Sequence, residues 1–128
     1  MLANMVPDSE WIQRTNDELR DYHFMLSEIE RLQGILKDEN KAIVRASKER
    51  KQKRLRKLQE TVKRIEHAAN TITDEREKTV LDSIMDGEKN NIIARQIGVS
   101  RQRYYEIKRS VINKMATLMY GTDEEDLR

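Results

Sequence analysis

Apolar residues recur at intervals of three and four over most of the chain, and this spacing predicts helices. The first stripe spans residues 9–36, and residues 7–9 before it are typical of a helix start with Asp8 or Ser9 as the cap. Gly34 and the polar residues 37–40 predict an end or a hinge near residues 37–41. The stripe itself consists of Leu19, Tyr22, Leu26, Ile29 and Leu36.

A second stripe with the same spacing follows over about residues 41–69. It consists of Leu55, Leu58, Val62, Ile65 and Ala69. The run from Lys48 to Arg54 contains no apolar residue, so it is either a solvated helix or an arm that lies on phosphates. The two stripes could pack together as a helical hairpin or pair between two chains. Because the first stripe has the spacing of a coiled coil, we expect a homodimer formed through it.

The third predicted helix runs from Thr73 to Asp86. Residues 71–73 supply capping hydroxyls, and the carboxylates that follow favour the positive end of the helix dipole. Gly87 is expected to end this helix. Its inner face consists of Val80, Leu81 and Ile84.

Two short helical stretches joined by a tight turn carry the strongest functional signal. Gly98 can take a positive φ at little cost, and Ser100 is a good N-cap for the helix that follows. Ile93 and Ile97 face inward, the small Ala94 allows a close helix crossing, and Val99 fills the core beside the turn. The second helix continues inward through Tyr104, Ile107, Val111, Met115 and Leu118, up to Gly121. This pattern predicts a helix-turn-helix over Lys89 to Met119 whose second helix protrudes.

Forked donors and amides dominate the outward face of that second helix. In the major groove Arg pairs with guanine and Gln with adenine, and Glu106 could accept from a cytosine amino group. Arg103, Lys108 and Arg109 are suited to phosphates, and Asn90 and Asn91 could present backbone N–H groups to another phosphate. We therefore predict a double-stranded DNA-binding surface that consists of Ser100, Arg101, Gln102, Arg103, Tyr105, Glu106, Lys108, Arg109, Asn90 and Asn91.

Composition supports an all-α fold, with long N-terminal helices (a hairpin or a coiled coil) followed by a C-terminal helix-turn-helix domain. The 128 residues include 38% charged and 5% aromatic side chains, one proline and four glycines, which suits helices better than a sheet. We expect an oligomerisation or partner region over 1–70 with a basic segment at 41–64, a DNA-binding domain over 71–121 and an acidic tail at 122–128.

Charge is distributed unevenly along the chain. Residues 1–40 carry four basic and nine acidic side chains (net −5), and residues 41–70 carry eleven basic and three acidic ones (net +8). A concentrated basic stretch of this kind is what a nucleic-acid-binding protein needs. We expect contacts between the DNA backbone and Lys51, Lys53 and Arg54.

Several function classes are disfavoured by the residues that the chain lacks. It has no cysteine, and His23 and His67 lie far apart, so we expect neither a metal site nor another cofactor. The absence of a phosphate-binding Gly-rich loop and of a nucleophile with a recognisable base argues against an enzyme. Residues 1–8 have no secretion signal and no apolar run is long enough for a membrane span, so we expect a cytoplasmic, nucleoid-associated protein without membrane contact.

The segment from Thr73 to Leu81, together with that from Ile93 to Arg101, resembles region 4 of bacterial sigma factors over about 45 residues. Two N-terminal stretches, Asp17 to Tyr22 and Leu58 to Glu66, resemble phage late-gene transcription activators of the RinA/ArpU type. The sequence departs from the sigma pattern at Lys89, Tyr105 and Glu106, so its target need not be a standard promoter element.

These resemblances imply a transcription regulator that activates phage packaging and structural genes in a bacterial host. Two alternatives stay open at this point. The acidic N-terminal helix could contact RNA polymerase or another protein while the DNA-binding module only assists. The protein could also be the recognition subunit of a phage DNA-packaging machine, which likewise combines a helix-turn-helix with helical oligomerisation.

Overall fold

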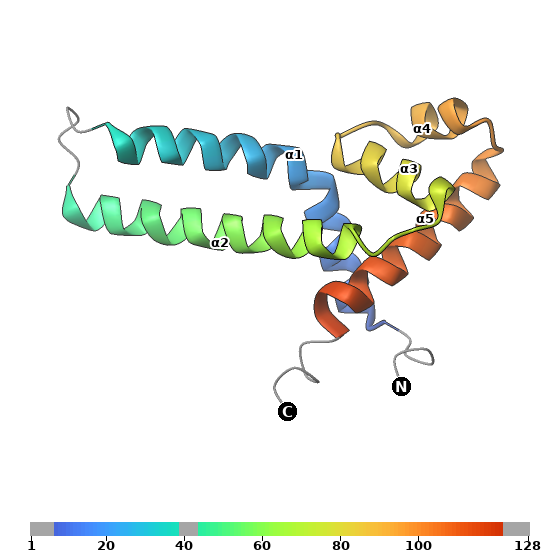
Figure 1. Cartoon of the computed structure of the whole chain (residues 1–128), viewed down its shortest axis with the longest axis horizontal. Helices are drawn as coiled ribbons and strands as arrows, with labels where there is room; N and C mark the ends of the chain where they lie inside the picture. The colour runs from blue at the N-terminus through green and yellow to red at the C-terminus, as the bar shows by residue number, and fades with distance from the viewer. Residues whose placement is uncertain (1–6, 39–43, 122–128) are drawn as a thin grey trace.

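A computed structural model describes residues 7–38 and 44–121, and within these ranges the chain is helical with no strand (Figure 1). The prediction of an all-α protein is therefore confirmed. Residues 41–43 of the predicted basic segment and the predicted acidic tail at 122–128 lie outside the described residues. The helices are α1 (Ser9–Lys37), α2 (Arg45–Ala69), α3 (Glu75–Met85), α4 (Asn90–Ile97) and α5 (Arg101–Ala116), and a π-helical turn (Thr117–Gly121) extends α5.

The first two helices lie antiparallel as a hairpin within one chain (Figure 1). Leu32 of α1 and Val62 of α2 are buried. The Tyr22 hydroxyl donates a 2.6 Å hydrogen bond to a Glu66 carboxylate oxygen, which ties the two helices together near the base of the hairpin. The N-terminal part of α1 continues past the hairpin and packs against α5 instead.

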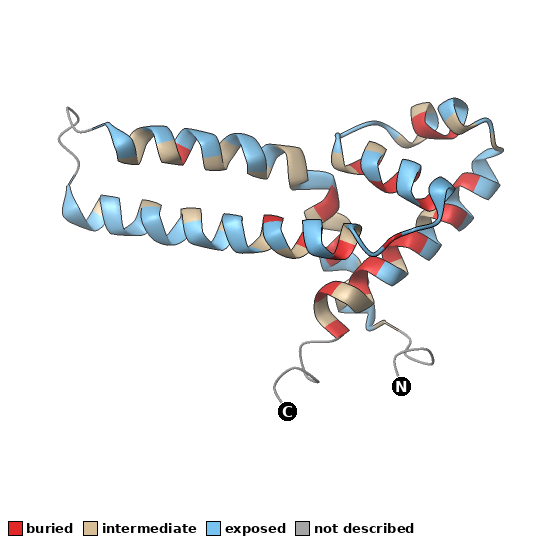
Figure 2. Ribbon diagram, in the orientation of Figure 1, coloured by how far each residue is buried: buried red, intermediate tan, exposed pale blue. Residues whose placement is uncertain are grey.

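One hydrophobic core joins the hairpin to the three C-terminal helices. Leu19 and Ile65 from the hairpin pack in the same cluster as Val80 of α3 and Tyr104 and Val111 of α5, and all five are fully buried. Figure 2 shows the buried residues gathered where these helices meet, while the outer end of the hairpin is mostly exposed. The core therefore extends across residue 70, where the sequence suggested a change of domain.

The predicted oligomerisation stripe lies partly inside this core. Leu19 is fully buried by its own chain, and Tyr22, Ile29 and Leu36 are partly buried. Leu26 is 41% exposed. Much of the stripe thus has partners within one chain, and a homodimer formed through it stays a prediction.

The cap at the start of α1 agrees with the sequence, and the cap at the start of α3 differs from it. Asp8 caps α1 and accepts from the Glu10 N–H, as expected. The cap of α3 is the Asp74 carboxylate, which accepts from the Glu77 N–H at 2.9 Å, so the predicted capping hydroxyl is wrong. Thr71 is used elsewhere, because its hydroxyl donates to the Ala68 carbonyl at the end of α2.

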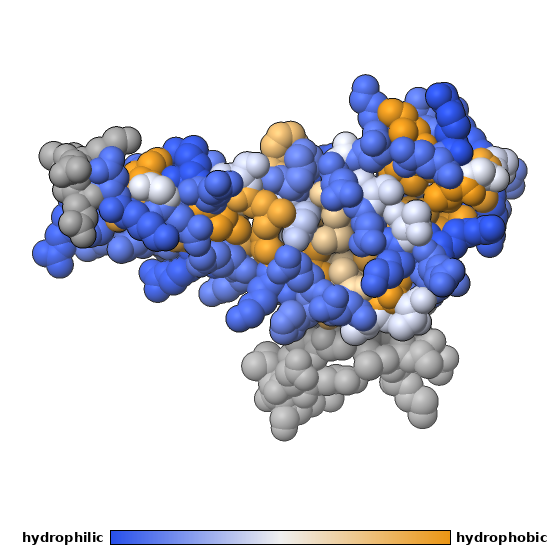
Figure 3. Space-filling model, turned by 45° about the horizontal axis from the view of Figure 1, so that its top comes forward, coloured by the Kyte–Doolittle hydropathy of each residue, from blue (hydrophilic) through white to orange (hydrophobic). Residues whose placement is uncertain are grey.

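Polar side chains dominate the face of the molecule in Figure 3, with apolar groups between them. No helix among the described residues combines the length and the apolar character that crossing a bilayer requires. The expectation that the chain has no membrane span agrees with this finding.

Candidate nucleic-acid interface

The turn between α4 and α5 is built by local backbone preferences. Gly98 has φ of +69°, which residues with an L side chain rarely adopt. Its N–H donates a hydrogen bond to the Arg95 carbonyl oxygen. The Ser100 hydroxyl then accepts from the Arg103 N–H at 3.1 Å and caps α5. Ser100, a predicted contact residue, therefore uses its hydroxyl to start α5.

The inward face of α5 is fixed against α3 and α4. Tyr104, Ile107, Val111 and Met115 are buried as the sequence predicts. The Tyr104 hydroxyl donates to the Asn90 side-chain oxygen Oδ1 at 2.6 Å. Burial, helped by the neighbouring Tyr105, raises the pKa of Tyr104 to about 12, so this phenol stays a donor at neutral pH. The start of α4 and the first turn of α5 are thus held together.

The opposite face of α5 is free at its N-terminal half. At 100° per residue, Gln102, Tyr105 and Arg109 fall on the outer side of the helix, and all three are exposed. Arg101 is also exposed, and its guanidinium carbon lies 5.8 Å from the centre of the Tyr105 ring. Within the described residues, neither arginine is paired with a carboxylate.

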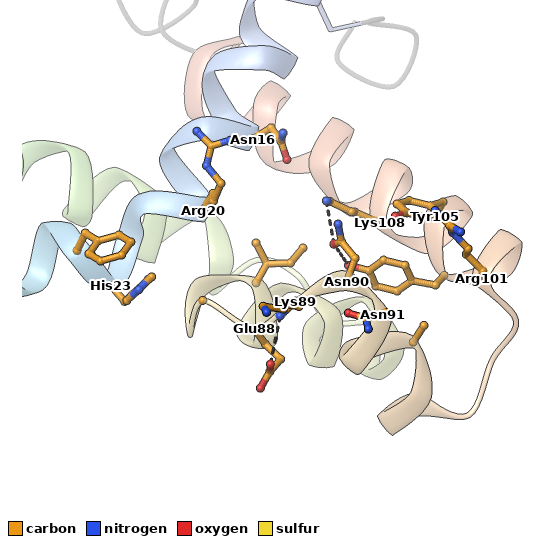
Figure 4. A pocket seen from close by; sticks show the side chains of 15 residues that line it. Asn16, Arg20, His23, Glu88, Lys89, Asn90, Asn91, Arg101, Tyr105 and Lys108 are labelled. Carbon is orange, nitrogen blue, oxygen red and sulfur yellow. Dashed lines mark hydrogen bonds between the residues drawn. The ribbon is translucent and has the colours of Figure 1, made fainter.

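A groove of about 870 Å³ runs beside this face, and we call it the α1–α5 groove. α1 forms one wall, and α5 and the start of α4 form the other (Figure 4). Its lining includes four cations and one carboxylate, Glu88, which accepts from the Lys89 N–H. The groove is therefore positively charged. The polar residues that line it include Asn16, Arg20, Lys89, Asn90, Asn91, Arg101, Tyr105 and Lys108.

Lys108 is the most enclosed of these cations. It is half-buried, and its ammonium donates to the Asn90 side-chain oxygen at 3.1 Å. Burial lowers the pKa of Lys108, and the positive charge of Arg20 lowers it further. No carboxylate among the described residues pairs with it. The fold thus holds Lys108 near a like charge without neutralising it.

The other side of α5 has a different electrostatic character. A second groove of about 880 Å³, the α3–α5 groove, is lined by both acidic and basic side chains. There Arg103 donates to Glu106 at 3.1 Å, and Lys114 donates to the buried carboxylate of Glu77 at 2.5 Å. The predicted contact residues Arg103 and Glu106 therefore face this groove and pair with each other.

Beyond its first turns one side of α5 is covered by α1. Arg109 lines a small hollow of about 290 Å³ between the two helices, together with Ile12 and Asn16. Ile112, one turn further on, is buried. Past the first turns α5 still exposes Arg109, Ser110 and Lys114, so α1 covers one side of this part of the helix and leaves another side accessible.

The predicted backbone contacts on α2 lie apart from this site, toward the outer end of the hairpin (Figure 1). Arg54 is already bound to Glu28 at 3.4 Å, and the half-buried Lys51 donates to the Ser47 hydroxyl at 3.0 Å. Lys53 is exposed, with no partner among the described residues. Of the three lysine and arginine side chains, Lys53 is therefore the one that no other described residue engages, and a phosphate contact by any of the three stays a prediction.

The structure adds Asn16, Arg20 and Lys89 to the residues expected from sequence. Asn16 and Arg20 lie on α1, far from α5 along the chain, and reach the groove only because α1 crosses α5. Helical spacing places Arg20 beside the buried Leu19, but it does not say which later helix will face it. Lys89 immediately precedes α4, where it provides no side-chain cap.

Comparisons of the chain with models of protein families, with curated proteins and with solved structures found no match.

Proposed function

We propose that the protein is a sequence-specific DNA-binding transcription regulator in which α4, the turn at Gly98 and α5 act as a helix-turn-helix. One observation carries this proposal: α5 is fixed by its buried face and presents Arg101, Gln102 and Tyr105 on its exposed N-terminal half. A helix held in this way can enter the major groove with its first turns, where arginine and glutamine distinguish bases.

Charge supports the same orientation. The α1–α5 groove beside the exposed face is lined by four cations and one carboxylate, whereas the α3–α5 groove is lined by three cations and four carboxylates. Phosphates that flank a bound helix would favour the first side. Arg103 and Glu106 consequently have a secondary place in the proposed contact, and Arg101, Gln102, Tyr105 and Arg109 the primary one.

The test is a selection of binding sites from random duplexes, followed by affinity measurements with variants. Replacing Arg101 or Gln102 by Ala should cost about 1–3 kcal/mol on the selected site, which is about five- to 150-fold in affinity, and should relax specificity at one position. Arg76→Ala and Gln59→Ala are matched controls, because Arg76 faces the α3–α5 groove and Gln59 is exposed on α2. A wild-type protein that enriches no sequence would refute the proposal.

We also propose a narrower role, the activation of phage late genes, and this part rests on the sequence resemblance alone. A footprint of the purified protein on the phage genome tests this part. Protection upstream of packaging or structural genes would support it, and protection elsewhere would leave a DNA-binding regulator of another kind.

A further inference from the structure

We propose that Arg20 of α1 and Lys108 of α5 together hold one phosphate of the DNA strand that passes beside α5. This inference rests on the proposed function and extends the interface to a helix outside the α4–α5 unit. It assigns to α1 a direct part in binding DNA, in addition to its part in the core.

Like charges brought together by the fold are the first observation. Arg20 and Lys108 are far apart in sequence, yet both line the α1–α5 groove, and Figure 4 shows the Lys108 side chain extending across it toward α1. The Arg20 side chain is exposed and the Lys108 side chain is half-buried, so packing against each other does not explain why they lie on the same groove. An anion between two such cations relieves their repulsion and recovers a favourable interaction from each.

The second observation is the number of donors that remain. Arg20 contacts Asp17 at 3.3 Å through one terminal nitrogen and Asp21 at 3.5 Å through Nε. Its side chain is 66% exposed, so these are surface ion pairs that contribute little and can rearrange. A guanidinium has five N–H donors, which leaves enough for a phosphate. Lys108 donates to Asn90 and has further ammonium hydrogens available.

The position of the groove favours DNA as the source of the phosphate. Arg101 and Tyr105 of the proposed base-contacting face line the same groove as Arg20 and Lys108. A strand that follows the edge of the major groove past α5 would therefore place a phosphate between α5 and α1. A free anion of the same chemistry is the alternative source, and the experiment separates the two.

Binding of a mixed-sequence duplex, measured by fluorescence anisotropy over a range of salt concentrations, tests the proposal without knowledge of the operator. R20Q and K108Q should each weaken binding about tenfold, as expected for one charged hydrogen bond. The double variant should weaken it by less than the product of the two, and its salt slope should fall by about 1, the value for a single phosphate. R31Q is the control, because Arg31 is also an exposed arginine of α1 but does not line the α1–α5 groove.

Several results would overturn the inference and leave the proposed function standing. R20Q could bind like R31Q, or the double variant could lose the full product with a slope change of about 2, which would mean two separate phosphates. Inorganic phosphate could bind the wild type at submillimolar concentration and fail to bind R20Q, which would assign the pair to a free anion. A wild type that binds no duplex would instead refute the proposed function itself.

A second measurement shows whether the variants act through the groove or through folding. R20Q should raise the pKa of Lys108 toward its ordinary value, because Arg20 lowers it, and ¹⁵N NMR of the ammonium group reports this directly. Addition of the duplex to the wild type should raise the same pKa, since a phosphate stabilises the charged form. No change in either titration would contradict the placement of a phosphate at Lys108.

Discussion

Two glycines with a positive φ have different surroundings, and this difference is testable one residue at a time. Gly87 and Gly98 have φ of +83° and +69°. A Cβ on Gly87 would lie 2.6 Å from the His23 ring, whereas a Cβ on Gly98 would meet nothing within 4 Å. Gly98→Ala should therefore cost about 1–2 kcal/mol for the left-handed backbone alone, and Gly87→Ala should cost more because the ring must also move.

Urea unfolding measures the change in the free energy of unfolding for both substitutions. Gly34→Ala is the control, because it should stabilise the protein where the other two destabilise it. Gly34 lies inside α1 with open space where its Cβ would be, so Gly34→Ala should stabilise the protein by about 0.5–1 kcal/mol. Equal costs at Gly87 and Gly98 would show that the His23 contact does not constrain the loop.

The same pair of glycines shows what local sequence can specify. The positive φ of Gly98 and the cap at Ser100 were predictable, because each depends on residues within one turn. The packing of His23 against Gly87 was not, since it depends on where α1 lies relative to the loop after α3. The backbone contact of Asn90 with a phosphate stays a prediction, and local sequence did not indicate that its side-chain oxygen accepts from both Tyr104 and Lys108.

At the scale of secondary-structure elements, the buried carboxylate of Glu77 links α3 to α5. Glu77 is 7% exposed, and its two oxygens accept from Ser110 at 2.7 Å and from Lys114 at 2.5 Å. Glu77→Ala should lower the free energy of unfolding by about 1–3 kcal/mol, because both donors lose their acceptor. The exposed Glu75 in the same turn is the control, and Glu75→Ala should change stability by no more than about 0.5 kcal/mol in urea unfolding. Equal effects of the two substitutions would contradict this role.

Glu28 joins the two helices of the hairpin in a way that depends on pH. Hydrogen bonds from Arg31 and, across the hairpin, from Arg54 lower the pKa of Glu28 to about 2. Because the folded pKa lies below the unfolded one, this carboxylate contributes stability above about pH 4.5 that is lost as the pH falls toward 2. Carboxyl NMR should give a pKa near 2 in the wild type and a higher value in R54Q. A pKa near 4.5 in the wild type would show that the bond does not persist in solution.

Helices were easier to predict than the contacts between them. Because residues 48–54 contain no apolar residue, the sequence leaves the first half of α2 open as a solvated helix or an arm. The period of three and four predicts α1 and the second half of α2, which buries Val62, Ile65 and Ala68. It does not determine that the first turns of α1 cross α5, nor that Thr117–Gly121 widens into a π-helical turn. The candidate site was therefore predictable on α5, where the side chains are consecutive, and incomplete at Arg20, which a different helix supplies.

At the scale of the whole molecule, the shared core implies that the hairpin and the C-terminal helices fold together. Leu19 and Ile65 complete the cluster around Tyr104 and Met115, and the Tyr120 hydroxyl donates to Glu18 of α1. Removing the hairpin would expose this cluster to water, so we expect residues 71–128 alone to be largely unfolded and the full chain to unfold in one transition.

Trp11 makes this cooperativity measurable, because it is the single tryptophan and lies on α1, whereas circular dichroism reports all helices. The two signals should give the same urea midpoint. Leu19→Ala should shift both midpoints together by an amount that corresponds to about 2–5 kcal/mol, since it leaves a cavity in the common core. A tryptophan transition at lower urea than the circular dichroism transition would mean that α1 detaches first. The wall of the α1–α5 groove that carries Arg20 would then be lost before α5 unfolds, and duplex affinity would fall at the lower midpoint.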